Sequence, residues 1–139
     1  MVPPSHLKHG TLIKFEVRSP ITQLQLKAYA EASGDPNPIH LDEGVAKSVG
    51  LPGVIAHGML LAAFIAERGE IYIRDELKIS AWKLVRLQTR FKSMTFIGDE
   101  IAIGGIVKEV SESDIVLDLQ AKNQNGEIVT VGSLRYGLR

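Results

Sequence analysis

The apolar run from Met59 to Ala66 is the feature that most constrains the fold of this 139-residue chain. Its sequence, MLLAAFIA, is apolar on nearly every face of a helix, so other elements must surround a helix formed there. The run is much shorter than the ~20 residues that a membrane span needs. We therefore expect a buried helix from Gly58 to about Glu67, a sheet that wraps it, and no membrane-spanning segment.

The second half of the chain has the pattern typical of strands. From Val85 to Lys92, apolar and polar residues alternate with a period of two, which indicates one buried and one exposed face. Gly104–Gly105 suggests a β-bulge, and Asn125–Gly126 predicts a type I′ hairpin turn. The pattern predicts an antiparallel meander, with further strands at Glu100–Val110, Ile115–Ala121 and Glu127–Leu138.

The first half carries helix signals. Thr22, followed three residues later by a glutamine, forms a capping box ahead of a helix expected over Gln23–Ala32. Asp42 can cap a short second helix that ends near Gly50. A short strand is expected over Thr11–Ser19.

No repeat or linker divides the chain, so helices in the first half and strands in the second predict one α+β domain over residues 1–139. A curved antiparallel sheet wrapped around a central hydrophobic helix is the hot-dog fold.

Charge and composition exclude several classes of function. Sixteen Lys and Arg balance sixteen Asp and Glu, so we expect neither nucleic acid nor a membrane surface as a partner. The chain has no cysteine, which excludes disulfides, thiolate nucleophiles and cysteine-based zinc sites. Residues 1–10 lack an apolar stretch after a basic one, so we expect no secretory signal and a cytoplasmic protein.

The segment from Asp35 to His40, with the sequence DPNPIH, is the strongest candidate for chemistry. The two prolines exclude a helix or a central strand over Gly34–Pro38, so we expect a stiff loop there. General acid–base catalysis needs two titratable groups that face one substrate atom or water, and Asp35 and His40 are such a pair. From spacing alone, Asp35 and Asn37 could equally be turn formers and His40 a buried structural histidine.

The segment from residue 29 to residue 46 resembles the MaoC-like hydratase/dehydratase family; its sequence is YAEASGDPNPIHLDEGVA. The shared pattern is an aromatic residue, then Ser-Gly-Asp-x-Asn-Pro-x-His, and then a small residue. Two further blocks, IAHGML at residues 55–60 and the less specific FIGDE at residues 96–100, extend the resemblance over nearly the whole chain. It implies a hot-dog fold and, without a cofactor, (R)-specific hydration of trans-2-enoyl thioesters of CoA or acyl carrier protein. The products would be (R)-3-hydroxyacyl thioesters, and in the reverse direction the enzyme would dehydrate them. Either reaction would belong to fatty-acid metabolism.

The resemblance also implies roles for individual residues. Asp35 and His40 would hold the reacting water, and the backbone N–H at Gly58 would supply an oxyanion-hole donor. Asn37 would pin the loop, and His57 would make a structural hydrogen bond. Zinc bound by Asp35, His40 and His57 is conceivable from ligand type alone, but the family uses no metal, so we expect none.

Some alternatives stay open at this point. Certain members of the family carry a serine where Ala66 stands here, which leaves open how the Asp35 carboxylate is oriented. The chain could instead be a hot-dog acyl-CoA thioesterase, which would share the fold. It could also be one subunit of a heteromeric 3-hydroxyacyl dehydratase, with little activity alone. We expect a homodimer, because one sheet curled around a helix leaves an edge strand open for pairing.

Overall fold

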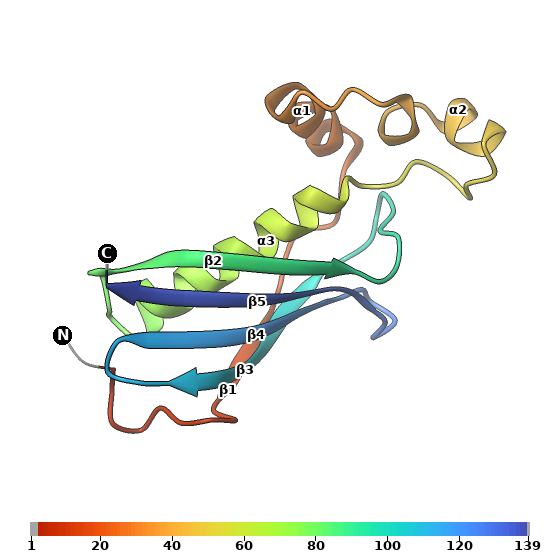
Figure 1. The fold of residues 1–139 in the computed structure, drawn as a ribbon. Coiled ribbons are helices and arrows are strands. Elements are labelled where there is room, and N and C mark those ends of the chain that lie inside the picture. Colours follow the sequence, from red (N-terminus) through yellow and green to blue (C-terminus); the bar gives the residue numbers. More distant parts are fainter. Residues whose placement is uncertain (1–2, 139) are drawn as a thin grey trace.

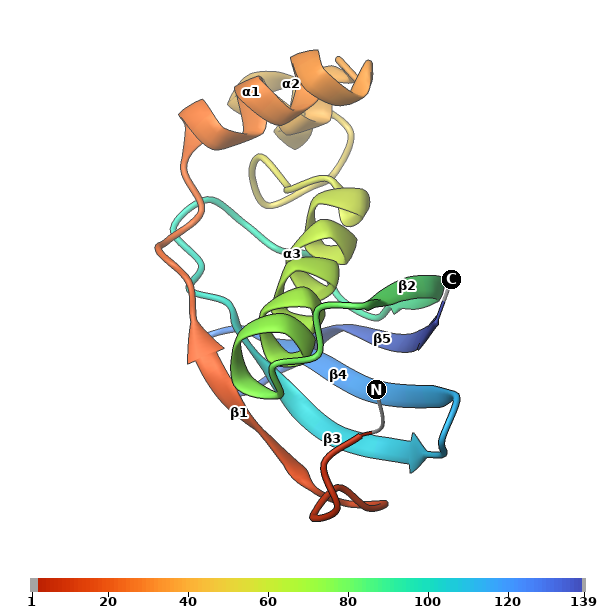
Figure 2. The same cartoon turned by 90° about the vertical axis from the view of Figure 1, so that its left-hand side faces the viewer.

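The structure is a computed structural model that describes residues 3–138. A five-stranded antiparallel sheet curls around one long helix, α3 (Gly58–Ile71), which lies against its concave face (Figure 1, Figure 2). Two shorter helices, α1 (Gln23–Ser33) and α2 (Glu43–Ser48), lie beyond the N-terminal end of α3. The predicted α+β architecture is therefore the one observed.

The sheet has the strand order β1-β3-β4-β5-β2, and every neighbouring pair is antiparallel. The predicted meander is confirmed for β3, β4 and β5, whereas β2 pairs with β5 at one edge and β1 pairs with β3 at the other. The strands are β1 (Leu12–Val17), β2 (Trp82–Phe91), β3 (Ala102–Val110), β4 (Asp114–Lys122) and β5 (Ile128–Leu138).

The turn between β4 and β5 differs from the prediction. A type I′ turn needs positive φ at both central residues, but Gly126 has φ 79° and Asn125 does not have a positive φ. Gly126 N–H donates to Asn123 O at 3.0 Å, and Asn123 N–H donates to Glu127 O at 2.9 Å. The prediction of type I′ is wrong, because the glycine closes a four-residue turn that begins at Asn123 instead of occupying its centre.

The bulge predicted at Gly104–Gly105 lies in the neighbouring strand. Between Ile13 and Glu16 the register of β1 against β3 shifts, so that two residues of β1 lie opposite Gly104. A Cβ on Gly104 would lie 2.7 Å from Ile13 O and from Phe15 Cα. Glycine is therefore needed at this position so that the bulged strand can approach β3 closely.

Both predicted helix caps are confirmed, but α3 is longer than expected. Thr22 and Asp42 each accept a hydrogen bond from a backbone N–H in the first turn of their helix, at 3.1 and 2.9 Å. α3 continues past Glu67 to Ile71 and then into a π-helical turn over Tyr72–Glu76.

The buried side chain of Arg68 makes this extension possible. Its guanidinium donates to Glu76 Oε2 and to Lys14 O, both at 2.7 Å, so the charge is paired inside the fold. Lys14 lies in the bulge of β1, which leaves its carbonyl available. A charged residue thus sits where sequence alone indicates the end of a buried helix.

α3 packs closely on the sheet through glycine. A Cβ on Gly132 of β5 would lie 2.8 Å from Ile65 Cγ2, and one on Gly69 would lie 2.6 Å from the hydroxyl of Tyr136. This contact fixes the axis of α3, so that its N-terminus points toward the α1–α2 segment. Among residues 3–138, no helix is both long and apolar enough to cross a membrane.

Candidate active site

The segment between α1 and α2 is held in shape by local hydrogen bonds. Gly34 ends α1 in the left-handed conformation, with φ 75°. Asn37 Oδ1 accepts from Ile39 N at 3.1 Å and caps a single 3₁₀ turn, Pro38–His40. The stiff loop expected over Gly34–Pro38 therefore leads into one helical turn that begins at its last residue, because proline is tolerated at the first position of a helix. Asp35 Oδ1 accepts a longer hydrogen bond, 3.4 Å, from Asn37 N.

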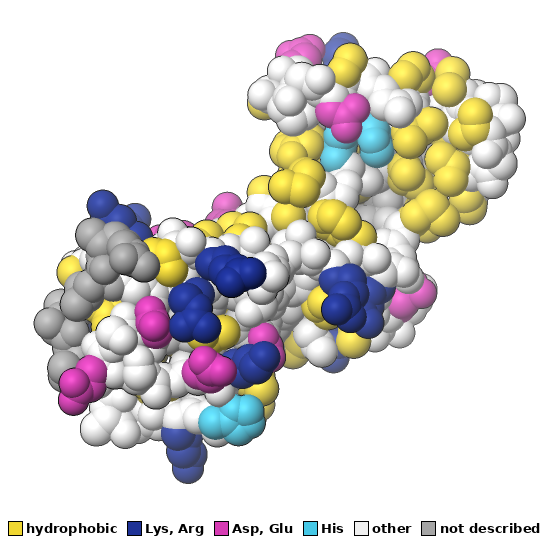
Figure 3. All heavy atoms as spheres, viewed as in Figure 1, with side chains coloured by type: hydrophobic (Ala, Val, Ile, Leu, Met, Phe, Trp, Pro, Cys, Tyr) yellow, Lys and Arg dark blue, Asp and Glu magenta, His cyan; other side chains and the backbone are white. Residues whose placement is uncertain are grey.

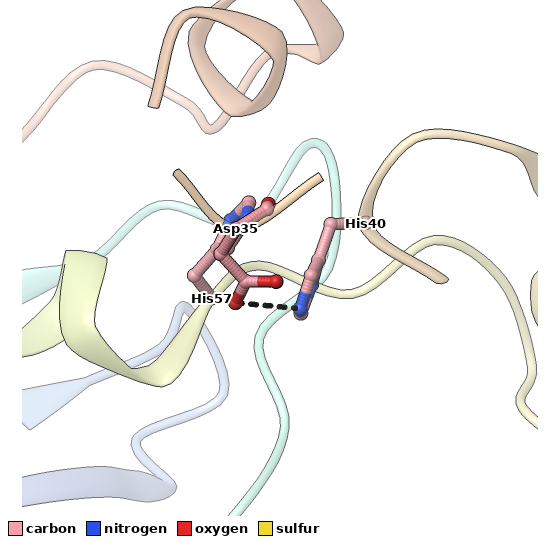
Figure 4. Close-up of side chains that lie close together, drawn as sticks. All are labelled: Asp35, His40 and His57. Atoms are coloured by element: carbon pink, nitrogen blue, oxygen red, sulfur yellow. Dashed lines mark hydrogen bonds and ion pairs between the residues drawn. The ribbon is translucent and has the colours of Figure 1, made fainter. Parts of the chain in front are cut away.

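His40 is buried, and one of its ring nitrogens is fixed. Nδ1 lies 2.8 Å from Ile55 O, and since a carbonyl only accepts, Nδ1 carries the proton and donates. The other nitrogen, Nε2, has a free lone pair in the neutral imidazole and lies 4.0 Å from Asp35 Oδ2 (Figure 4). That separation is too long for a direct hydrogen bond but suits a water that bridges the two atoms.

His57 connects this segment to α3. Its side chain is buried, and Nε2 donates to the backbone carbonyl of Asp35 at 3.0 Å. The ring stacks on that of His40 at a centroid distance of 3.7 Å, and Tyr29 packs edge-on against it at 4.8 Å. His57 is also the residue immediately before the first turn of α3, so the loop and the helix end are held together.

Gly58 begins α3, and the N–H of a first helical residue has no acceptor within its helix. The positive end of the helix dipole adds to its ability to bind an anion. A Cβ on Gly58 would lie 3.3 Å from the ring of Phe91 at the end of β2. The chain before Gly58 is fixed as well, because Ala56 N donates to Thr95 O at 2.8 Å.

The structure thus brings Asp35, His40 and His57 together, with Gly58 adjoining them along the chain. Asp35 is open to solvent, with 54% of its side chain exposed, while both imidazoles are buried. In Figure 3 some histidine atoms are nevertheless visible from outside near the α1–α2 segment, flanked by hydrophobic side chains. The arrangement offers an accessible carboxylate and an imidazole lone pair to one water or substrate atom.

The same three residues are the set that could hold a metal ion. Asp35, His40 and His57 each offer one ligand atom, and these atoms all lie within 4.8 Å of one another. A metal on His57 Nε2 would break the hydrogen bond of that atom to Asp35 O. The expectation that this cluster binds no metal stays a prediction.

Sequence reasoning did not place Phe91 or Thr95 at this site. Alternation along β2 marks Phe91 as a residue of the inner face, but which helix residue it meets is decided by the packing of α3. Thr95 contributes a backbone carbonyl, which has no sequence signal.

Comparison with known proteins gives the family. The model of the MaoC like domain matches residues 5–127. The chain belongs to the MaoC-like domain family. The (R)-specific enoyl-CoA hydratase of Aeromonas caviae is 28% identical over 118 residues, which cover 78% of this chain and 79% of that protein. Fatty acid synthase 2 of Mycosarcoma maydis is 30% identical over 111 residues, covering 78% of this chain but 3% of the synthase.

Solved structures agree with this assignment. An R-hydratase from Pseudomonas aeruginosa superposes with a TM-score of 0.81 and 27% identity, covering 99% of this chain and 85% of that one. The predicted hot-dog fold of this MaoC-like domain is therefore confirmed. The chain spans from 3% to 47% of the length of several curated relatives, so the activities of those whole proteins are not assigned to this chain by the match.

Proposed function

We propose that this MaoC-like domain hydrates trans-2-enoyl thioesters to (R)-3-hydroxyacyl thioesters and catalyses the reverse dehydration. The observation that supports this most is the 4.0 Å separation of His40 Nε2 and Asp35 Oδ2, with Nδ1 of His40 already occupied by its hydrogen bond to Ile55 O. The (R)-specific enoyl-CoA hydratase of Aeromonas caviae, which is 28% identical, supports the same reaction.

The pair would act on a single water. Both Nε2 of His40 and the carboxylate of Asp35 accept hydrogen bonds, so a water between them donates one hydrogen to each. Transfer of one proton to the pair turns the water oxygen into a nucleophile that attacks C3, while C2 receives one proton from the pair. The elements of water are added across the double bond, and the site returns to its starting protonation state.

Gly58 would stabilise the charge that develops during this addition. Attack at C3 moves electron density onto the thioester oxygen, which then needs a fixed donor. The N–H of Gly58, at the positive end of α3, is such a donor. In this proposal Asn37 holds the loop through its bond to Ile39 N, and His57 holds Asp35 against the helix end.

We also propose that the working unit is a homodimer joined at the β2 edges. β2 is a ten-residue edge strand without proline, and its inward side chains Leu84, Leu87 and Thr89 are only half-buried. Leu134, opposite Leu87 on β5, is fully buried. A second copy paired along β2 would cover the remaining apolar surface and remove the open edge.

A panel of trans-2-enoyl-CoA thioesters from short to long acyl chains tests the proposed reaction. We expect loss of the absorbance of the conjugated thioester and, by chiral analysis, an (R)-3-hydroxyacyl product. Predominant (S) product would contradict the stereochemical assignment. Release of free thiol would instead indicate a thioesterase, and inactivity with every chain length would favour a subunit that needs a different partner chain.

A further inference from the structure

The turn at residues 96–99, between β2 and β3, is closed by a buried carboxylate. Asp99 N donates to Phe96 O at 3.1 Å, and Gly98 has φ 92°, so the four residues form a tight turn. Asp99 Oδ2 accepts from Phe96 N at 2.9 Å, which ties the last residue of the turn to the first. The side chain is buried, and among residues 3–138 it has no ion pair. Its hydrogen bonds alone stabilise the buried carboxylate, so the turn and this side chain depend on each other.

The second carboxylate oxygen of Asp99 is held by another loop. Gln124, in the turn between β4 and β5, donates from Nε2 to Asp99 Oδ1 at 2.9 Å. The same side-chain amide accepts from Glu100 N through Oε1 at 3.1 Å. Both oxygens of Asp99 therefore have a donor, and each of the three N–H groups in this cluster has an acceptor.

The turn at residues 96–99 also holds the segment that orients His40. Phe96 forms an antiparallel bridge with Ile55, and Ala56 N donates to Thr95 O at 2.8 Å. Ile55 O accepts from His40 Nδ1 at 2.8 Å, and this bond sets the direction in which Nε2 points. The carbonyl that orients His40 thus belongs to a residue paired directly with the turn.

The same turn holds the start of α1. Ile21 N donates to Asp99 O at 3.0 Å, and Gly98 N donates to Ile21 O at 2.8 Å. Ile21 is buried and directly precedes Thr22, the cap residue of α1. The C-terminal end of α1 leads to Asp35. Both members of the proposed pair are therefore attached, by different routes, to one turn.

We propose that Asp99 is a positioning residue for the pair formed by His40 and Asp35. Its carboxylate fixes the turn at residues 96–99, and the turn holds both the Ile55 carbonyl that orients His40 and the helix that leads to Asp35. The inference rests on the proposed function, because it assumes that this pair holds the reacting water. Asp99 is not one of the groups that hold the water, so its effect is on their geometry.

Substitutions at Asp99 and Gln124 test these hydrogen bonds. Asp99→Ala removes both acceptors. Asp99→Asn keeps the shape, but its NH₂ group has to face either Phe96 N or the amide nitrogen of Gln124. Combining Asp99→Asn with Gln124→Glu exchanges the amide and the carboxylate, so that each N–H group again has an acceptor.

The kinetic test compares kcat and KM with trans-2-butenoyl-CoA, per amount of folded protein. We expect kcat to fall about 10- to 100-fold in Asp99→Ala, because small displacements of catalytic groups have effects of this size. KM should change little, since no substrate-binding group is removed. Gln124 is exposed and can turn away from the new amide, so Asp99→Asn should lie between Asp99→Ala and the wild type. The exchanged double variant should recover a kcat close to that of the wild type.

The matched control is Asp114→Ala. The carboxylate of Asp114 accepts from Arg135 at 3.3 Å, at the end of β4 opposite to the Gln124 turn. Its loss should leave kcat unchanged. A fall in kcat that is equally large in Asp114→Ala and Asp99→Ala, or a folded Asp99→Ala with wild-type kcat, would overturn the inference.

Nuclear magnetic resonance of isotope-labelled histidine tests the positioning of His40 without catalysis. In the wild type, the neutral His40 ring should carry its proton on Nδ1, as the bond to Ile55 O requires, and His40→Gln identifies its signals. Asp99→Ala should shift His40 toward a mixture of the two tautomers, and the exchanged double variant should restore the Nδ1–H form. These changes would support the positioning role even if the wild type lacked hydratase activity, which would contradict the proposed function alone. Unchanged His40 signals in folded Asp99→Ala would overturn the inference, because Asp99 would then stabilise the fold without orienting His40.

Discussion

Replacing Gly58 by alanine separates its catalytic role from its packing role. The new Cβ would lie 3.3 Å from Phe91 Cε1, so the ring must yield by a few tenths of an ångström, and it can do so because Phe91 is 50% exposed. Alanine is favoured over glycine in a helix by up to ~1 kcal/mol. These two effects oppose each other, so we expect the free energy of unfolding to change by less than ~1 kcal/mol.

The activity should respond much more strongly to the same change. The added methyl group occupies the space beside the Gly58 N–H, and loss of one oxyanion-hole donor typically costs ~10²- to 10³-fold, or about 2.7–4 kcal/mol in the barrier. The measurements are kcat/KM with trans-2-butenoyl-CoA and the urea-induced unfolding of the same preparation.

The matched control for this prediction is Gly44→Ala in α2. A Cβ at Gly44 would lie 3.2 Å from Asp42 Oδ1, which is an equally tight contact away from the proposed oxyanion site. This variant should keep its activity within about twofold. If Gly58→Ala loses activity and stability in parallel, or if it retains activity, Gly58 is a packing glycine and the oxyanion assignment is wrong.

Three further results are expected. The hydroxyl of Tyr136 is buried and has no partner among residues 3–138, so Tyr136→Phe should leave the free energy of unfolding in urea unchanged or raise it by ~1 kcal/mol. Burial raises the pKa of Tyr136, so the folded state holds this proton more tightly than the unfolded state does. The free energy of unfolding of the wild type should therefore fall as pH rises above ~10. It should fall less steeply in Tyr136→Phe, and equal dependence on pH in the two proteins would contradict this. EDTA should leave the hydratase activity unchanged, and a loss restored by Zn²⁺ would show that Asp35, His40 and His57 hold a metal. Sedimentation should find twice the 15.2 kDa chain mass, and an active monomer at micromolar concentration would refute the dimer.

The parts of the fold that local sequence determines were predictable. Thr22 and Asp42 cap helices through N–H groups three residues away, so the signal and its partner lie within one turn. The type I′ prediction for Asn125–Gly126 is wrong because the same dipeptide occurs in two hairpin geometries. The side chain of Asn123 selects the observed one by accepting from Asn125 N and Glu127 N.

The parts that depend on distant contacts were not predictable from periodicity. The bulge lies in β1 because Gly104 of β3 lets that strand approach, and only the register between the two strands reveals it. The extension of α3 depends on Arg68, whose partner Lys14 O lies in that bulge. The motif indicated Asp35 and His40, but the bond between His57 and Asp35 O joins segments 22 residues apart and required the fold.

The central claim is that Asp35 and His40 act together on one water, and a double-mutant comparison tests it most directly. Asp35→Asn and His40→Gln preserve the side-chain shape and some hydrogen bonding while removing proton transfer. Rates with trans-2-butenoyl-CoA are measured for both single variants and the double variant, with circular dichroism as the check on folding. We predict that each folded single variant loses most of its activity, on the order of 10²- to 10⁴-fold, and that the double variant loses no more than the worse of the two. A folded single variant with near wild-type turnover, or losses that multiply in the double variant, would contradict the account.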